Sequence, residues 1–266
     1  KERLDRLLVE RGLVETRTRA QALIMAGKVV VDKRRRDKPG ERVPIDAEIT
    51  VKGHDAWASR GAYKLLGALE AFEELAQALP GARCLDIGAS TGGFTDVMLR
   101  RGAAEVVAVD VGYGQLHERL RQDTRVTVLD RTNIRHLAPG ALPWSPTVAT
   151  CDASFISVRL FLDVVFRELA PSGLFVVLVK PQFEVGREKV GKGGVVRDDA
   201  DRLGALEAVK LRAREVGFED VGWAESPVAG PSGNRELLLA LRKPGNGVPK
   251  EPVGSEARPP AAPEEL

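Results

Sequence analysis

The feature that most constrains the fold of this chain is a regular alternation of short apolar strands and helices that begins near residue 82. Strands are expected at 83–87, 105–110, 126–129, 148–152 and 174–180, and helices at 93–101, 114–122, 156–170 and 199–216. Two further strands, 218–224 and 236–242, are joined by a turn and can pair antiparallel. This alternation predicts an α/β unit with a mostly parallel, Rossmann-like seven-stranded sheet, covered on both faces, with a ligand at the carboxyl ends of its strands.

The first 60 residues follow a different pattern, which indicates a small α+β unit. Two short helices lead to a strand at 29–31, a basic loop at 32–42 and a second strand at 45–51. A longer helix with apolar residues at helical spacing is expected at 61–79. We expect the N-terminal unit to span 1–52, a linker 53–60, the α/β unit 61–243, and a disordered, proline-rich tail 244–266. A chain of 266 residues is long enough for one large core and such a satellite.

Positive charge is concentrated in the N-terminal unit. The formal net charge of the whole chain is only +2, which by itself predicts no nucleic-acid partner. Residues 17–42, however, hold 9 Lys or Arg against 3 Asp or Glu. This asymmetry fits a phosphate-binding surface, although the cluster taken alone favours a solvated surface loop.

Short motifs in the same unit resemble the S-four-type RNA-binding domain, which is named after a ribosomal protein. The matching stretches are Arg-Leu-Asp at 3–5, Thr-Arg-Ala-Gln-Ala-Leu-Ile at 18–24, Gly-Lys-Val at 27–29 and Val-Asp at 31–32. The resemblance implies that the unit binds RNA through a basic face. The resulting candidates for RNA contact are Arg3, Arg17, Arg19, Lys28, Arg34 and Arg35.

A glycine-rich turn, Asp-Ile-Gly-Ala-Ser-Thr-Gly-Gly-Phe at 86–94, joins the first strand of the larger unit to its first helix. Glycines let the backbone approach a ligand closely, and Asp86 at the strand end can accept a hydrogen bond from an ammonium group. A pyrophosphate-binding turn would read G-x-G-x-x-G, whereas this one reads G-x-x-x-G-G behind an acidic residue that would repel phosphate. The turn resembles the first motif of S-adenosylmethionine-dependent methyltransferases, which implies that cofactor.

The ends of the next two strands extend the expected cofactor site. Asp110 ends the second strand, where its carboxylate can hold both ribose hydroxyls of the cofactor. Asp130 ends the third strand and either contacts the adenine amino group or caps the following loop. Phe94 either packs on the cofactor or belongs to the core. The cofactor-binding candidates are Asp86, Gly88, Ser90, Thr91, Gly92, Gly93, Phe94, Asp110 and Asp130.

Four charged residues lie far apart in the sequence, each in a distinctive motif. Lys64 lies in Ser-Arg-Gly-Ala-Tyr-Lys-Leu, Asp152 in Cys-Asp-Ala-Ser-Phe, Lys180 in Val-Lys-Pro-Gln-Phe-Glu and Glu236 in Gly-Asn-Arg-Glu. In order and context they resemble the Lys-Asp-Lys-Glu tetrad of the RNA ribose 2′-O-methyltransferases related to FtsJ. A ribose hydroxyl is a weak acid and needs a base, so the resemblance implies Lys180 as the general base and the other three as positioning groups. The alternative is four surface charges in salt bridges, and the matching motifs weigh against it.

Two more segments are candidates for RNA contact. Ser59 and Arg60 precede the first tetrad residue and could grip a phosphate, and a basic loop at 187–194 contributes Lys189 and Lys192 as a substrate lid. For both segments, composition alone describes an ordinary exposed loop equally well.

The two cysteines, Cys84 and Cys151, predict neither a disulfide framework nor a zinc site. Cys151 could in principle attack a pyrimidine ring, as cysteine does in carbon-5 methyltransferases. Strand alternation points it away from Asp152, and the Pro-Cys pair of those enzymes is missing. We therefore expect a buried structural cysteine and no metal.

The order of an RNA-binding unit and an FtsJ-like unit resembles the TlyA family over nearly all of 1–243. That family implies methylation of cytidine 2′-hydroxyls in ribosomal RNA, with S-adenosylmethionine as cofactor and ribosomal subunits as partners. The alternatives are a non-catalytic ribosome-assembly factor and a haemolysin, a label that the family has carried. No apolar run approaches the roughly 20 residues that cross a bilayer, which weighs against a haemolysin. The two cysteines, which predict no disulfide framework, favour the reducing cytoplasm as the compartment. The modified nucleotide and the oligomeric state stay open.

Overall fold

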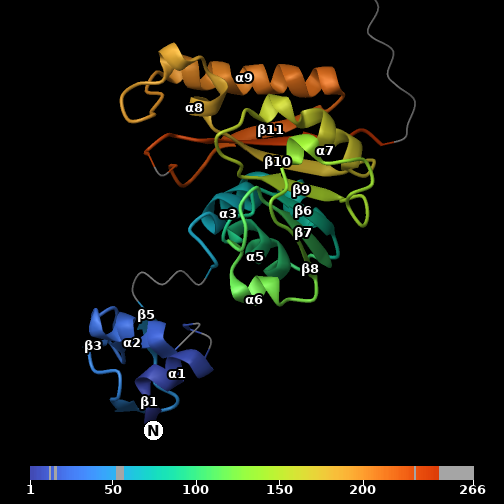
Figure 1. The fold of residues 1–266 in the computed structure, drawn as a ribbon. Coiled ribbons are helices and arrows are strands. Elements are labelled where there is room, and N and C mark those ends of the chain that lie inside the picture. The colour runs from blue at the N-terminus through green and yellow to red at the C-terminus, as the bar shows by residue number, and fades with distance from the viewer. Residues whose placement is uncertain (12, 15–16, 52–56, 231, 246–266) are drawn as a thin grey trace, which may run out of the picture.

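The computed structural model of the protein describes residues 1–11, 13–14, 17–51, 57–230 and 232–245. Its larger unit is built on a seven-stranded sheet with the order β11-β12-β10-β9-β6-β7-β8 (Figure 1). The parallel strands are β6 (Arg83–Ile87), β7 (Glu105–Val109), β8 (Val126–Leu129), β9 (Val148–Cys151) and β10 (Leu174–Val179). Strand β12 (Leu237–Arg242) pairs antiparallel with β10 and with β11 (Glu219–Glu225). The predicted α/β sheet, with its last strands antiparallel, is confirmed.

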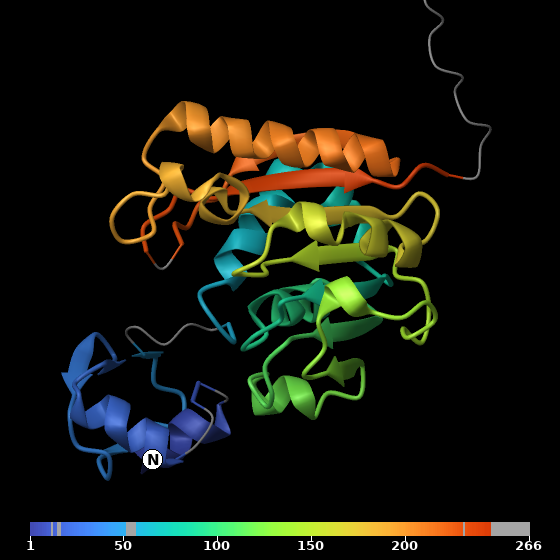
Figure 2. The ribbon, with the colours of Figure 1, turned by 45° about the horizontal axis from the view of Figure 1, so that its top comes forward.

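Helices cover both faces of the sheet, whose strands Figure 2 shows side by side from the red β12 to the green β8. Helices α3 (Ala62–Ala71) and α5 (Gly93–Arg100) contribute to one apolar cluster, and α7 (Leu162–Glu168) and α9 (Asp199–Val216) contribute to a second one. Every residue of β10 is buried because side chains on both of its faces are covered. The carboxyl ends of the strands are thereby left as the edge at which polar side chains can meet.

Three of the predicted helices are shorter in the structure. The helix expected at 61–79 is interrupted at Phe72, whose extended backbone places its ring in the core, so α3 is followed by a separate α4 (Glu73–Ala78). The helix expected at 114–122 is only α6 (Glu118–Arg121), and the one expected at 156–170 is a 3₁₀ turn (Val158–Leu160) followed by α7. In the last case the interruption is Phe161, which is fully buried. A one-turn helix, α8 (Pro181–Glu184), was not predicted.

The N-terminal unit has a core of its own, formed by apolar side chains of α1 (Leu4–Glu10), α2 (Arg17–Met25) and β2 (Val29–Val31). Strand β2 is the centre of a three-stranded sheet with the order β3-β2-β5, in which β3 is Arg34–Arg36 and β5 is Ile49–Val51. The two-residue strands β1 (Glu2–Arg3) and β4 (Arg42–Val43) pair antiparallel.

The basic run 32–42 was expected to be a loop, and this expectation was wrong for the residues of β3 and for Arg42, which begins β4. Asp32 and Lys33 have φ angles of 48° and 66°, the left-handed conformation of a two-residue hairpin turn. The turn folds Arg34–Arg36 back onto β2, so strand pairing fixes the arginines. Residues 53–56 of the expected linker and the tail from 246 onward lie outside the described residues. The domain boundaries stay predictions.

Candidate active site

The four residues of the predicted tetrad lie together at the carboxyl-end rim of the sheet. Lys64 comes from α3, Asp152 and Lys180 directly follow β9 and β10, and Glu236 directly precedes β12. The Nζ of Lys64 lies 3.1 Å from Oδ2 of Asp152 and 2.7 Å from Oε2 of Glu236. The Nζ of Lys180 lies 2.7 Å from Oδ1 of Asp152. Both amines therefore share one carboxylate.

These contacts are not surface salt bridges. Lys64, Lys180 and Glu236 are 6%, 6% and 1% exposed, and the two positive and two negative charges of the tetrad balance. Burial by itself would lower the pKa of Lys64, but the charges of Asp152 and Glu236 outweigh it and raise that pKa. Lys64 is thus held as a cation beside the second lysine.

Lys180 donates to three acceptors. Besides its ion pair with Asp152, its Nζ donates to Oγ of Ser154 over 2.8 Å and to the backbone oxygen of Asp152 over 3.2 Å. A lysine ammonium has three protons, so in this state each of them has a partner. The hydroxyl of Ser154 and the backbone oxygen of Asp152 are neutral acceptors, and Ser154 was not among the residues predicted from the sequence.

A cavity of about 340 Å³ connects the tetrad to the glycine-rich turn. Small-molecule sites in proteins commonly have volumes of about 300–1,000 Å³. The cavity is lined by Ser59, Arg60, Gly61, Lys64, Asp86, Gly88, Ala89, Ser90, Thr91, Gly93, Phe94, Asp152, Ser154, Lys180, Val228 and Ala229. One pocket therefore contains the predicted cofactor turn and three of the four tetrad residues, while Glu236 lies behind Lys64.

The glycines of the turn are required by close packing. Gly88 has a φ of 75°, and a Cβ built on it would lie 2.9 Å from Cα of Ala153. A Cβ on Gly93 would lie 2.4 Å from Oγ of Ser59 and 2.9 Å from the backbone nitrogen of Ala62. The turn is therefore pressed against the segment after β9 and against the start of α3, both of which carry tetrad residues.

Asp86 lies beneath this turn and is 1% exposed. Its Oδ2 accepts hydrogen bonds from the backbone nitrogen and the hydroxyl of Thr95, over 2.9 and 2.6 Å. Burial raises the pKa of Asp86 to about 7, because these hydrogen bonds only partly offset desolvation. A carboxyl group in the cavity wall that accepts its hydrogen bonds from Thr95 and Thr150 fits a positively charged ligand.

The other cofactor candidates have mixed surroundings. Asp110 accepts from the backbone nitrogens of Ser90 and Gly112 over 2.8 and 2.7 Å, so it shapes the turn. Asp130 accepts from the backbone nitrogen of Gly114 and pairs with Arg121, which favours its role as a loop cap. Neither carboxylate is among the residues that line the cavity. Phe94 belongs to the core and also lines the cavity, so its packing on the cofactor stays a prediction.

The RNA candidates of the N-terminal unit lie on its surface. Arg3 and Arg17 both pair with the fully buried Asp5, over 3.0 and 2.9 Å, and remain 38% and 51% exposed. Arg19, Lys28, Arg34 and Arg35 are exposed.

The segment just before α3 is docked on the larger unit. The ring of Trp57 packs under the guanidinium of Arg100 at 4.5 Å, and the backbone nitrogen of Ala58 donates to Asp96 over 2.9 Å. Ser59 and Arg60 follow and line the cavity. The two candidates therefore lie at the mouth of the pocket, on a segment whose position α5 fixes.

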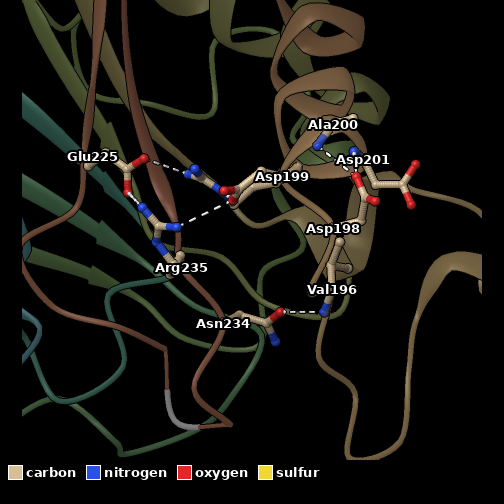
Figure 3. Close-up of polar contacts among 9 residues, drawn as sticks. Val196, Asp198, Asp199, Ala200, Asp201, Glu225, Asn234 and Arg235 are labelled. Atoms are coloured by element: carbon tan, nitrogen blue, oxygen red, sulfur yellow. Dashed lines mark hydrogen bonds and ion pairs between the residues drawn. The ribbon is translucent and has the colours of Figure 1, made fainter.

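The basic loop after α8 is fastened beside the tetrad. The side chain of Asn234 accepts from the backbone nitrogen of Val196 over 2.9 Å (Figure 3). It also donates to the backbone oxygen of Gly194 over 2.7 Å. Lys189 pairs with Asp201 over 2.7 Å, and Lys192 is exposed. Asn234 was missed by the sequence analysis, although its position two residues before Glu236 was a signal.

An exposed aromatic ring at the site was also missed. Phe155 is 91% exposed and has a φ of 64°, a conformation that bulky residues rarely adopt. Its ring lies 5.3 Å from that of Phe183. The combination of exposure, an unusual backbone and a position three residues after Asp152 indicates a functional surface.

Cys151 points into the core and is 1% exposed, as strand alternation predicted. Burial raises the pKa of its thiol to about 12, so it does not supply a thiolate at neutral pH. Within the described ranges, no group of three or more His, Cys, Asp or Glu side chains could hold a metal ion. In the same part of the chain, no helix has the length and apolar character needed to span a membrane.

The sheet with its antiparallel end strands, and the cavity at its carboxyl edge, define the class of the α/β methyltransferases. Comparison with known families specifies the group. The FtsJ-like methyltransferase model matches residues 57–243 and the S4 domain model matches residues 2–49. The chain belongs to the FtsJ-like methyltransferase family and carries an N-terminal S4 domain.

Several relatives are similar over almost the whole chain. The "16S/23S rRNA (cytidine-2'-O)-methyltransferase TlyA" of Mycobacterium tuberculosis is 51% identical over 90% of this chain and 89% of its own. "Hemolysin A" of Brachyspira hyodysenteriae is 37% identical over 89% of this chain and 98% of its own. The solved structure of a "putative hemolysin" from Streptococcus thermophilus has 43% identity and a TM-score of 0.69, covering 94% of this chain and 92% of that one.

Proposed function

We propose that this protein transfers a methyl group from S-adenosylmethionine to the ribose 2′-hydroxyl of a cytidine in ribosomal RNA. The observation that carries the proposal is the buried Lys64-Asp152-Lys180-Glu236 tetrad in the wall of the cavity that the glycine-rich turn also lines. The name of the Mycobacterium tuberculosis relative supports the RNA, the nucleoside and the atom.

The residues of the cavity fit the cofactor. S-adenosylmethionine supplies a methyl group on a positively charged sulfur and carries an ammonium group as well. Asp86 offers a carboxyl group that a nearby cation would ionise. The backbone of the turn at 88–93 leaves room for a ligand, and Asp110 and Asp130 hold the loops beside it.

The tetrad then acts on the hydroxyl that attacks the methyl group. Lys180 first loses one of its own protons, and its neutral amine then accepts the proton of the 2′-hydroxyl. Lys64 keeps a positive charge near the developing oxyanion. Asp152 orients both amines, and Glu236 holds Lys64 from behind. Such positioned proton transfer contributes a factor of about 10²–10⁴ to a rate.

The rest of the molecule would deliver the RNA. The S4 domain presents Arg3, Arg17, Arg19, Lys28, Arg34 and Arg35 to phosphates. Near the cavity, Arg60 and the loop with Lys189 and Lys192 would hold the strand that contains the target. The exposed ring of Phe155 would stack on the base of the target nucleotide, because single bases are bound in this way. Ribosomal subunits are the partners that such a substrate implies, and the cytoplasm is the compartment.

The test uses purified ribosomal subunits and S-adenosylmethionine with a labelled methyl group. We expect the protein to label rRNA, and Lys180→Ala to reduce the rate at least a hundredfold while cofactor affinity changes less than threefold. Lys210→Ala is the matched control, because Lys210 is also paired with two carboxylates, Asp220 and Glu207, but lies outside the site. Subunit binding without methyl transfer by the native protein would favour the assembly-factor alternative.

A further inference from the structure

Glu184 is a buried carboxylate to which the mechanism above gives no role. It lies in α8, four residues after Lys180, and its side chain is 1% exposed. Its Oε2 accepts from the hydroxyl of Ser157 over 2.6 Å and pairs with Arg159 over 3.1 Å, while its Oε1 accepts from the backbone nitrogen of Val158 over 2.7 Å. Arg159 also donates to the backbone oxygen of Glu184 over 2.9 Å. One residue thus fastens the segment 157–159 to α8.

The same segment is held at its other end by the tetrad. Ser154 accepts a hydrogen bond from Lys180 over 2.8 Å. Two anchor points, at Ser154 and at 157–159, therefore flank Phe155, and both are attached to the stretch 180–184. The ring of Phe155 packs against the ring of Phe183, which lies within that stretch.

The two anchors explain how an exposed phenylalanine can keep an unfavourable backbone conformation. A positive φ is costly for a residue with a Cβ and persists only where its surroundings impose it. The ring gains little burial in return, since 91% of the residue is exposed. Helix α8 has only one turn and is not stable by itself, so the contacts of Glu184 order both partners.

We propose that Glu184 is a positioning residue for the target nucleotide: it holds the segment 154–159 so that Phe155 presents a fixed stacking surface beside the tetrad. The inference rests on the proposed function, because the base to be stacked is that of the methylated nucleotide. It adds a residue that touches neither RNA nor cofactor and that acts through Phe155.

Burial raises the pKa of Glu184 because desolvation outweighs the hydrogen bonds from Ser157 and Val158 and the charge of Arg159. The four contacts with 157–159 hold the carboxylate in this position despite its desolvation.

The test is a double-mutant cycle on kcat/KM for rRNA. We expect Phe155→Ala to reduce kcat/KM about 30-fold, since stacking of one base is lost, and Glu184→Ala to reduce it about tenfold. If Glu184 acts through Phe155, the double variant is no slower than Phe155→Ala alone. A reduction of about 300-fold, the product of the two single effects, would overturn the proposal, and so would an unchanged kcat/KM in Glu184→Ala.

Glu168→Ala is the matched control. Glu168 is also buried, at 8% exposure, and pairs with Arg167, but it lies on α7 away from the cavity. Glu168→Ala should lower the midpoint of thermal unfolding as much as Glu184→Ala does, and should leave kcat/KM for rRNA unchanged. If both variants slow methyl transfer equally, Glu184 is only a stabilising residue and the proposal is wrong.

A second measurement does not depend on folding of the alanine variant or on catalysis. Glu184→Gln keeps an acceptor for Val158 but removes the charge that Arg159 needs, so it is expected to fold. Phe155→Trp serves as a fluorescent reporter once the signal of Trp57, Trp144 and Trp223, measured in the parent with Phe155, is subtracted. We expect the anisotropy of residue 155 to fall in the Glu184→Gln background and to stay unchanged in Glu168→Gln. Unchanged anisotropy in Glu184→Gln overturns the proposal. If anisotropy falls as expected but the native protein methylates no RNA, the proposed function fails and the rigid platform stands.

Discussion

Two buried carboxylates, Asp5 in the S4 domain and Asp86 in the methyltransferase unit, differ in what surrounds them. Asp5 is fully buried and accepts from the guanidiniums of Arg3 and Arg17 and from the amide of Gln21. These contacts, led by the hydrogen bond from Arg3, hold its pKa far below the usual range. Asp86 has an equally small exposed surface, but desolvation by burial outweighs the hydrogen bonds that it accepts from hydroxyls and a backbone nitrogen and raises its pKa to about 7.

The difference separates a carboxylate whose charge is neutralised by other residues of the protein from one whose charge a bound ligand would neutralise. The charge of Asp5 is compensated within the protein, and its role is to fix two arginines that remain partly exposed. The pKa of Asp86, about 7, leaves its carboxyl group partly protonated at neutral pH, and a cation in the cavity favours the ionised form. A buried acid with two cationic partners is a structural anchor, whereas one with neutral partners at a cavity wall marks a site for a cationic ligand.

The largest expected effect is on folding stability without cofactor. The pKa of Asp86 is about 7 in the folded protein and about 3.8 in the unfolded chain. Because the folded value is raised, its contribution is complete below pH 4 and is lost as the pH rises to 7, a change of about 4 kcal/mol at about 1.4 kcal/mol per pH unit. Urea unfolding at pH 4 to 8 should therefore show Asp86→Asn gaining stability relative to the native protein as the pH rises. A constant difference across this range would contradict the assigned state of Asp86.

Asp5→Asn should show the opposite pH dependence. The folded pKa of Asp5 is depressed, so its stabilisation is present at neutral pH and disappears as the pH falls below about 4. The arginines are half exposed and screened by water, so we expect a cost of about 2 kcal/mol at pH 7. Hydrogen exchange of the amides in α1 and β2 measures this cost within the S4 domain, and amides of β10 serve as the control. Equal loss of protection in both places would mean that the two units do not unfold separately.

Cofactor affinity should depend on pH in a direction that Asp86 sets. A cation in the cavity favours the ionised carboxylate, and ionisation is complete only above pH 7. We expect calorimetry to show S-adenosylmethionine binding about tenfold more tightly at pH 8 than at pH 6. In Asp86→Asn this pH dependence should vanish. A native affinity that does not change with pH would show that the cofactor charges lie too far from Asp86 to affect it.

Much of the site could be predicted from the sequence because of two simple rules. Apolar strands alternating with helices give a parallel sheet, and polar residues at the carboxyl ends of such strands meet at one edge. These rules place Asp152 and Lys180 next to each other. The other two tetrad residues are identified by the motif around Lys64 and by the position of Glu236 directly before the antiparallel last strand.

The missed residues act through contacts that no local pattern encodes. Glu184 and Asn234 bind backbone groups of loops that come close only in the folded chain. Arg34–Arg36 reads as a loop by composition, but pairing with β2 makes it a strand. The opposite states of Asp5 and Asp86 likewise follow from their neighbours in space and not from their positions at the ends of short motifs.

The smallest expected effect tests whether the arginines anchored by Asp5 bind phosphate. Arg17→Ala should reduce the slope of log affinity for rRNA against log salt concentration by about 0.7–0.9, which corresponds to one phosphate contact. Arg212→Ala is the control of equal charge, since Arg212 lies on α9 and pairs with Asp163 and Glu215.

Asp5→Asn raises the net charge by one and would strengthen RNA binding if charge alone mattered. We expect it instead to weaken binding, because Arg3 and Arg17 lose the carboxylate that orients them. Tighter binding by Asp5→Asn would show that net charge matters more than orientation in this domain.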